Sequence, residues 1–272
     1  EDAVKAFQNA LGESIGHIGE KELDICFYKA KAQVLDGKTK DALATYNAII
    51  KYNKDARAYY LRGDLYMDMG EEKKGKADFE SAVQHGKKNY EIYIGIYESL
   101  SRHEKKDEGQ KYLSAAMEIK GDKPEDELYK GRISYLLGEN KDAISYLEKA
   151  KEHKQMLASY YLGLAYDANG DSDKAKKCIA EYIKSGVATS YDLYELGMQE
   201  MQDGNYKNAL TYFNSGLELE KVPNKQNLMK SAIAAYEYSG DFDSAKKMMK
   251  EYLKAYPDDE EAKHENTFLE TR

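Results

Sequence analysis

The sequence predicts an all-α, right-handed solenoid of stacked helix-turn-helix units with a C-terminal capping helix. Small residues recur along the chain at intervals of about 34 residues, and glycines recur shortly before them. Only 3 prolines interrupt the 272 residues, so long helices are permitted. A fixed repeat of this length is typical of solenoids, in which each helical hairpin buries its apolar face against its neighbours.

The second helix of every predicted hairpin opens with a small residue. The series is Ala42, Gly75, Gly109, Ala143, Ala175, Ala209 and Ala245, with successive spacings of 33, 34, 34, 32, 34 and 36. A large apolar residue follows four positions later, in the series Tyr46, Phe79, Leu113, Leu147, Ile179, Phe213 and Met249. Positions i and i+4 share one face of a helix, so each second helix carries an apolar stripe.

The first helix of most hairpins is predicted to end at a glycine. These glycines are Gly37, Gly70, Gly138, Gly170, Gly204 and Gly240. Glycine accepts the left-handed backbone conformation that terminates many helices. Glu104 stands at this position in the third hairpin and breaks the column.

Residues 156–183 carry the fullest version of the pattern, with Leu162, Gly163, Tyr166 and Ala175. This pattern resembles the tetratricopeptide repeat family, whose first helix carries an aromatic residue, leucine, glycine and tyrosine. The second repeat matches through Tyr59, Gly63, Tyr66, Gly75, Phe79 and Ala82, and the sixth through Leu193, Leu196, Gly197, Ala209 and Phe213. The resemblance covers roughly residues 23–257 and implies a stack of helical hairpins.

Three departures from the family pattern stand out. Tyr97 replaces the expected glycine of the third repeat, and Glu127 occupies the aromatic position of the fourth. The late proline of the family pattern occurs only as Pro257. The third and fourth repeats are therefore the weakest matches.

The predicted organisation has three parts. Residues 1–22 form a partial repeat, a second helix with Ala3, Phe7 and Ala10, followed by a glycine-containing linker. Residues 23–257 form about seven repeats, starting near 23, 56, 90, 124, 156, 190 and 226, and residues 258–272 form a capping helix. The partial repeat is either the cut edge of a longer protein, which we favour, or an N-terminal cap.

Composition argues against several classes of protein. A net charge of −8 lowers the expectation of nucleic-acid binding, which needs a basic face. The 5 histidines and 2 cysteines have no metal-ligand spacing, and no catalytic constellation can be assembled, so we expect no cofactor, no metal and no enzyme activity. No apolar run is long enough to span a membrane.

The family resemblance implies a binding face. In that family the first helices line an inner, concave surface, and carrying the inward positions over gives a tyrosine-rich and methionine-containing groove. Its members are Tyr28, Tyr60, Met67, Tyr129, Tyr135, Tyr160, Tyr161, Tyr191, Tyr194, Met198, Met201 and Tyr238. Such a face suits an extended peptide or a helix. The alternative for any one ring is that it packs between neighbouring helices.

The predicted function is a non-catalytic scaffold that binds a protein or peptide partner through this groove. One alternative is a sensor or binding module of a larger regulatory or exported protein whose other part lies upstream of residue 1. Self-association through the end helices is a further possibility. No adjacent repeats present the lysine, asparagine and arginine set with which some family members grip a peptide carboxylate.

The sequence is compatible with more than one cellular compartment. The chain starts at Glu1, and a cytoplasmic protein and an exported, lipid-anchored one would look alike after loss of a leader. We lean to an extracytoplasmic bacterial protein, with a cytoplasmic one as the alternative.

We predict that Gly163→Leu lowers the thermal unfolding midpoint, because glycine lets the two helices of the fifth repeat approach closely. Circular dichroism against temperature measures the effect. A variant that melts like the parent would show that the repeat register is wrong.

Overall fold

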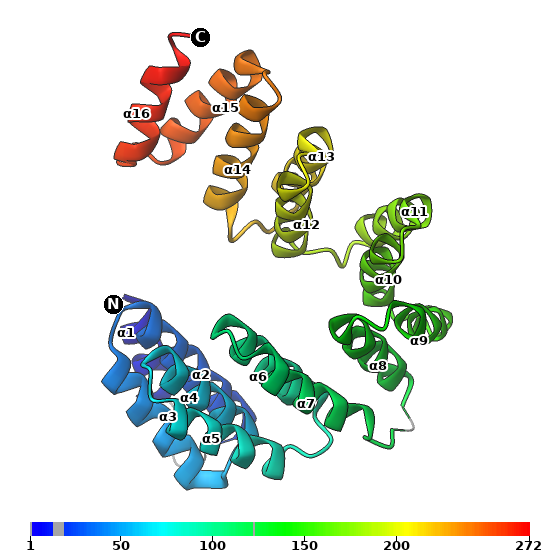
Figure 1. The fold of residues 1–272 in the computed structure, drawn as a ribbon. Helices are drawn as coiled ribbons and strands as arrows, with labels where there is room; N and C mark the ends of the chain where they lie inside the picture. Colours follow the sequence, from blue (N-terminus) through cyan, green and yellow to red (C-terminus); the bar gives the residue numbers. More distant parts are fainter. Residues whose placement is uncertain (1, 13–18, 122) are drawn as a thin grey trace. The chain divides into compact units, whose positions relative to one another are not determined.

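The helices and their turns follow the repeat pattern. A computed structural model of the chain describes residues 2–12, 19–121 and 123–272. These residues form α-helices joined by short turns, with no strand among them (Figure 1). Residues 13–18 of the predicted N-terminal linker lie outside the described part of the chain.

The helices in chain order are α1 (Asp2–Gly12), α2 (Glu20–Leu35), α3 (Thr39–Asn53), α4 (Ala56–Asp68), α5 (Glu72–His85), α6 (Tyr90–Arg102), α7 (Lys106–Met117), α8 (Pro124–Leu137), α9 (Asn140–Glu152), α10 (Leu157–Ala168), α11 (Ser172–Lys184), α12 (Ser190–Gln202), α13 (Tyr206–Leu217), α14 (Lys225–Tyr238), α15 (Phe242–Ala255) and α16 (Glu260–Leu269).

Adjacent helices pack as pairs, which confirms the all-α solenoid of helix-turn-helix units. Helices α2, α4, α6, α8, α12 and α14 each pack against the helix that follows. Within this arrangement α4 contacts α6, α8 contacts α10 and α12 contacts α14, so first helices lie beside first helices. The chain divides into two compact units, residues 1–175 and 176–272, which we call unit one and unit two.

A glycine sets the close approach of the two helices in several pairs. A Cβ atom on Gly63 would lie 2.9 Å from the Phe79 ring, and one on Gly197 would lie 2.3 Å from the Phe213 ring. Real Cβ atoms do not come this close to other heavy atoms, so the large side chain of the second helix needs the missing Cβ. The series of large apolar residues supplies these partners, and Phe79 and Phe213 are fully buried.

The predicted helix stops adopt the expected left-handed conformation. The glycines of this column have φ between +70° and +84°. After Gly138, the Glu139 amide donates to the Ser134 carbonyl at 2.9 Å, which closes the end of α8. Glu104 has the same conformation, with φ of +60°, and the Lys105 amide donates to the Leu100 carbonyl at 2.8 Å. The third repeat therefore keeps the turn without the glycine.

The C-terminal helix α16 covers the last repeat of unit two. Its Ala262 and Leu269 are buried in a cluster with Met249 and Tyr252 of α15. The Asp259 carboxylate accepts a hydrogen bond from the Ala262 amide at 3.1 Å and so caps the start of α16. None of the helices in the described residues is long and apolar enough to cross a membrane.

We predict that Gly138→Ala lowers the free energy of unfolding by about 1 kcal/mol, because alanine resists a left-handed φ. No atom lies within 4 Å of the added methyl group, so crowding does not contribute. Glu104→Gly, at the same position of the preceding repeat, should raise the free energy of unfolding slightly. Urea unfolding followed by circular dichroism measures both, and changes of equal sign would contradict the prediction.

Candidate functional face on the first helices

The structure places every predicted contact residue on the first helix of a pair. In unit one they are Tyr28 on α2, Tyr60 and Met67 on α4, Tyr129 and Tyr135 on α8, and Tyr160 and Tyr161 on α10. In unit two they are Tyr191, Tyr194, Met198 and Met201 on α12, and Tyr238 on α14. We call the surface that these helices form within each unit the first-helix face.

The predicted residues differ widely in exposure. Tyr28 and Tyr191 are each 56% exposed, and Tyr238 is 68% exposed. Met67 is 4% exposed and packs against Gly75, so it belongs to the core between α4 and α5 rather than to an accessible face. The others are half-buried. The repeat position alone does not separate these cases, because exposure depends on the neighbouring repeats.

Half-buried rings join the two helices of a pair. The Tyr60 ring packs against Phe79 with centroids 6.4 Å apart, and Tyr194 packs against Phe213 at 6.2 Å. Burial raises the pKa of the Tyr60 hydroxyl, and the nearby Asp64 carboxylate raises it further. This hydroxyl therefore stays protonated near neutral pH.

A hollow of about 330 Å³ opens between α2 and α4 of unit one. Its apolar lining comes from Phe27, Val34, Tyr46, Leu61 and Leu65, and its polar lining from Tyr28, Lys31, Arg57, Asp64 and Asp68. The Arg57 guanidinium lies over the Phe27 ring, 4.3 Å from its centroid. The hollow thus combines an apolar base with charged groups and one widely exposed ring.

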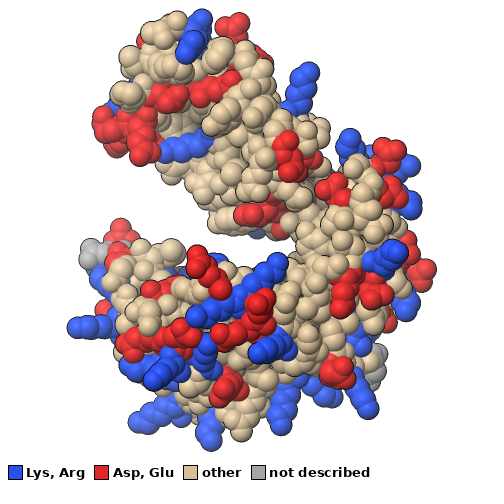
Figure 2. Space-filling model, in the orientation of Figure 1, with Lys and Arg blue, Asp and Glu red and all other residues tan. Residues whose placement is uncertain are grey.

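The first-helix face of unit one also carries ion pairs that sequence reasoning missed. Arg57 pairs with Asp24 at 3.4 Å, and Arg102 pairs with Asp64 at 2.5 Å and with Asp68 at 3.7 Å. Each pair joins one first helix to a neighbouring one. Acidic and basic side chains accordingly lie side by side over α4 and α6 in Figure 2.

Arg132 makes the most enclosed of these contacts. Its guanidinium lies 3.0 Å from the Glu98 carboxylate and 3.3 Å from that of Glu91, and its side chain is 17% exposed. It also lies over the Tyr161 ring, 5.5 Å from the centroid. Arg132 therefore connects α6, α8 and α10.

A signal for these pairs exists in the sequence. Asp24 and Arg57 are 33 residues apart, and Glu98 and Arg132 are 34 apart, so opposite charges occupy equal positions in successive repeats. Equal positions of neighbouring repeats lie side by side in a solenoid. Asp68 and Arg102, also 34 residues apart, follow the same rule, so searching for charge reversal at the repeat period would have found three of the pairs.

The first-helix face of unit two is more apolar. Tyr194, Met198 and Met201 border a core cluster that contains Phe213. Tyr238 stacks on Tyr206 of α13, with centroids 5.4 Å apart. Methionine side chains adapt their shape to irregular partners, so this surface suits a varied apolar contact.

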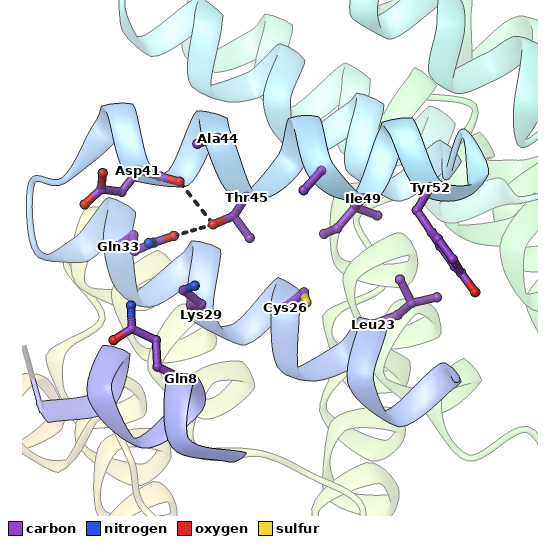
Figure 3. Close-up of a pocket in the computed structure, with 11 residues that line it drawn as sticks. Gln8, Leu23, Cys26, Lys29, Gln33, Asp41, Ala44, Thr45, Ile49 and Tyr52 are labelled. Atoms are coloured by element: carbon purple, nitrogen blue, oxygen red, sulfur yellow. Dashed lines mark hydrogen bonds between the residues drawn. The ribbon is translucent and has the colours of Figure 1, made fainter. Parts of the chain in front are cut away.

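A second hollow in unit one, of about 490 Å³, lies among α1, α2 and α3 (Figure 3). Leu23, Cys26 and Ile49 give it an apolar wall, and Tyr52 stands at its edge. The Thr45 hydroxyl donates to the buried Gln33 amide oxygen at 2.9 Å. No predicted contact residue lines this hollow.

Neither cysteine forms a disulfide: Cys26 is half-buried and Cys178 is buried. Burial raises the pKa of the Cys26 thiol, which keeps it in the unreactive protonated form.

Across residues 2–12, 19–121 and 123–272, no group of three or more histidine, cysteine, aspartate or glutamate side chains could hold a metal ion.

Comparison with protein families matches the tetratricopeptide repeat at residues 56–84, and again at residues 157–185 and 226–259. In residue range, these segments correspond to α4 and α5, α10 and α11, and α14 and α15. The chain is a tetratricopeptide repeat protein. Among curated proteins, no match to its sequence was found.

Solved structures share the fold at low sequence identity. A tetratricopeptide repeat protein from Parabacteroides merdae is 12% identical, with a TM-score of 0.53 over 85% of this chain and 90% of that one. The APC/C hetero-tetramer Cut9–Hcn1 is 17% identical, with a TM-score of 0.50 over 97% of this chain and 52% of that one. The type IV pilus biogenesis factor PilW is 18% identical, with a TM-score of 0.49 over 77% of this chain and 97% of that one.

Tetratricopeptide repeats generally act as protein-interaction scaffolds and are usually non-catalytic, and no enzyme family matches this chain. The likeness to the solved structures concerns the fold alone.

We predict that Arg132 and Glu98 are coupled by about 1 kcal/mol in the free energy of unfolding, because the Arg132 side chain is largely shielded from water. A double-mutant cycle with Arg132→Met and Glu98→Gln measures this coupling. The exposed pair Arg57 and Asp24 is the control, with an expected coupling near zero. Equal coupling in the two cycles would contradict the prediction.

Proposed function

We propose that the first-helix face binds a segment of a partner protein. The observation that carries the proposal is the hollow between α2 and α4, where the exposed Tyr28 ring stands beside an apolar base and charged groups. Tyrosine offers a large contact area and a hydroxyl at low entropic cost, and binding sites are enriched in it for this reason.

Two further features support a polypeptide ligand. First helices contact each other as α4 with α6, α8 with α10 and α12 with α14, and ion pairs join α2 to α4 and α6 to α8, so their side chains form an open surface rather than a closed pocket. Rings, ion pairs and apolar patches also alternate along this surface, which suits a chain that presents different side chains in turn. A protein segment is therefore the ligand class we propose, in keeping with the usual role of the family.

We predict that Tyr28→Ala weakens binding of peptides selected on the full chain by about tenfold, the loss expected for an aromatic contact worth roughly 1.4 kcal/mol. A peptide-library screen selects ligands on the parent, and fluorescence anisotropy compares the variants after circular dichroism shows that they are folded. Tyr52→Ala is the control, because Tyr52 is 53% exposed but lies on a second helix.

Peptides that lose affinity equally with Tyr28→Ala and Tyr52→Ala would contradict the proposal. Tyr191→Ala extends the test to unit two, where Tyr191 has the same exposure as Tyr28. The unit whose variant loses affinity is the one that binds.

A further inference from the structure

A second groove lies at the end of unit two, between α14 and the capping helix α16. Its volume is about 290 Å³, and Ile233, Met249 and Ala262 form an apolar floor. Glu237, Glu261 and Glu265 stand around this floor. Figure 2 shows acidic side chains gathered over α16 and the helices beside it.

The carboxylates Glu237 and Glu265 face each other without a cation. Glu237 Oε1 is buried and has no hydrogen-bond partner, and no lysine or arginine in the described part of the chain pairs with either residue. Burial raises the pKa of Glu237, and the Glu265 carboxylate raises it further. Glu237 is half-buried as a residue, but its shielded oxygen beside a like charge is a costly arrangement, and a bound cation would relieve it.

The lysine of the groove is engaged elsewhere. Lys230 Nζ lies 2.8 Å from Asp259 and 3.7 Å from Glu261. Asp259 also accepts a hydrogen bond from the Tyr252 hydroxyl at 2.5 Å, so this cluster holds the start of α16 in place. Lys230 therefore pairs with acidic residues at the start of the capping helix and does not neutralise the charges of Glu237 and Glu265.

We propose that this groove receives a lysine or arginine side chain of a partner protein. The aliphatic stem lies on the floor of Ile233 and Met249, and the cationic head lies between Glu237 and Glu265. Charge complementarity and an apolar floor together select a basic side chain over an acidic or a small polar one. A volume of about 290 Å³ lies at the small end of ligand pockets and suits one side chain.

This inference rests on the proposed binding function and deepens it. Lys230, Ala234 and Glu237 lie on α14, the first helix of its pair, and α14 contacts α12. The groove therefore continues the first-helix face of unit two. A partner segment that crosses this face can place a basic residue in the groove.

The test uses the full chain and a library of amidated peptides in which one position holds lysine, arginine or acetyl-lysine. We expect the parent to bind the lysine and arginine peptides at least tenfold more tightly than their acetyl-lysine counterparts. Glu237→Gln combined with Glu265→Gln should abolish this preference. Glu260→Gln combined with Glu270→Gln is the control, because it removes the same number of charges at the two ends of α16, from residues that do not line the groove.

Each of the other possible outcomes decides between the basic-residue inference and the proposed function. If lysine and acetyl-lysine peptides bind equally while Tyr191→Ala still weakens binding, the basic-residue inference is overturned and the proposed function stands. If no peptide binds the parent, both are overturned. If light scattering shows a dimer that the Glu237→Gln and Glu265→Gln variant loses, the occupant is a second copy of the chain and not a separate partner.

Discussion

The structure depends on one close contact that recurs in several helix pairs. A glycine of the first helix lies against a large side chain of the second helix. Gly63 with Phe79 and Gly197 with Phe213 show it through aromatic partners, and a Cβ on Gly131 would lie 2.4 Å from Leu147. This contact fixes which side of the first helix is buried within its own pair. The opposite side is left for neighbouring repeats and for a partner.

The same constraint gives the rings of the first-helix face two roles. Tyr60 and Tyr194 pack on the phenylalanines that face these glycines, so they stabilise the pair while remaining half-buried. Tyr28 and Tyr191 are far more exposed and contribute less to packing. Packing and solvent exposure therefore fall largely on different tyrosines, which makes the exposed ones suitable for substitution in a test of the proposed binding.

Charge distinguishes the two units. In unit one, Arg102 and Arg132 each lie between two carboxylates, so these four acidic groups are paired. In unit two, Lys230 is held by the capping helix, and Glu237 and Glu265 are not paired with a lysine or arginine in the described residues. Glu237 has one buried oxygen without a hydrogen-bond partner, so the groove beside α16 has an electrostatic reason to bind a cation.

The sequence by itself determined the helices, their pairing and their stops, because a period of about 34 residues and a left-handed glycine are local signals. Glu104, which breaks the glycine column, takes the same left-handed conformation as the glycines, which the sequence pattern did not predict. Only the tertiary structure decided that Met67 is core while Tyr28 is exposed, and that Arg132 joins three helices. Exposure and ion pairing depend on side chains of other helices, and a repeat pattern fixes a residue's position in its own helix but not the identity of these neighbours.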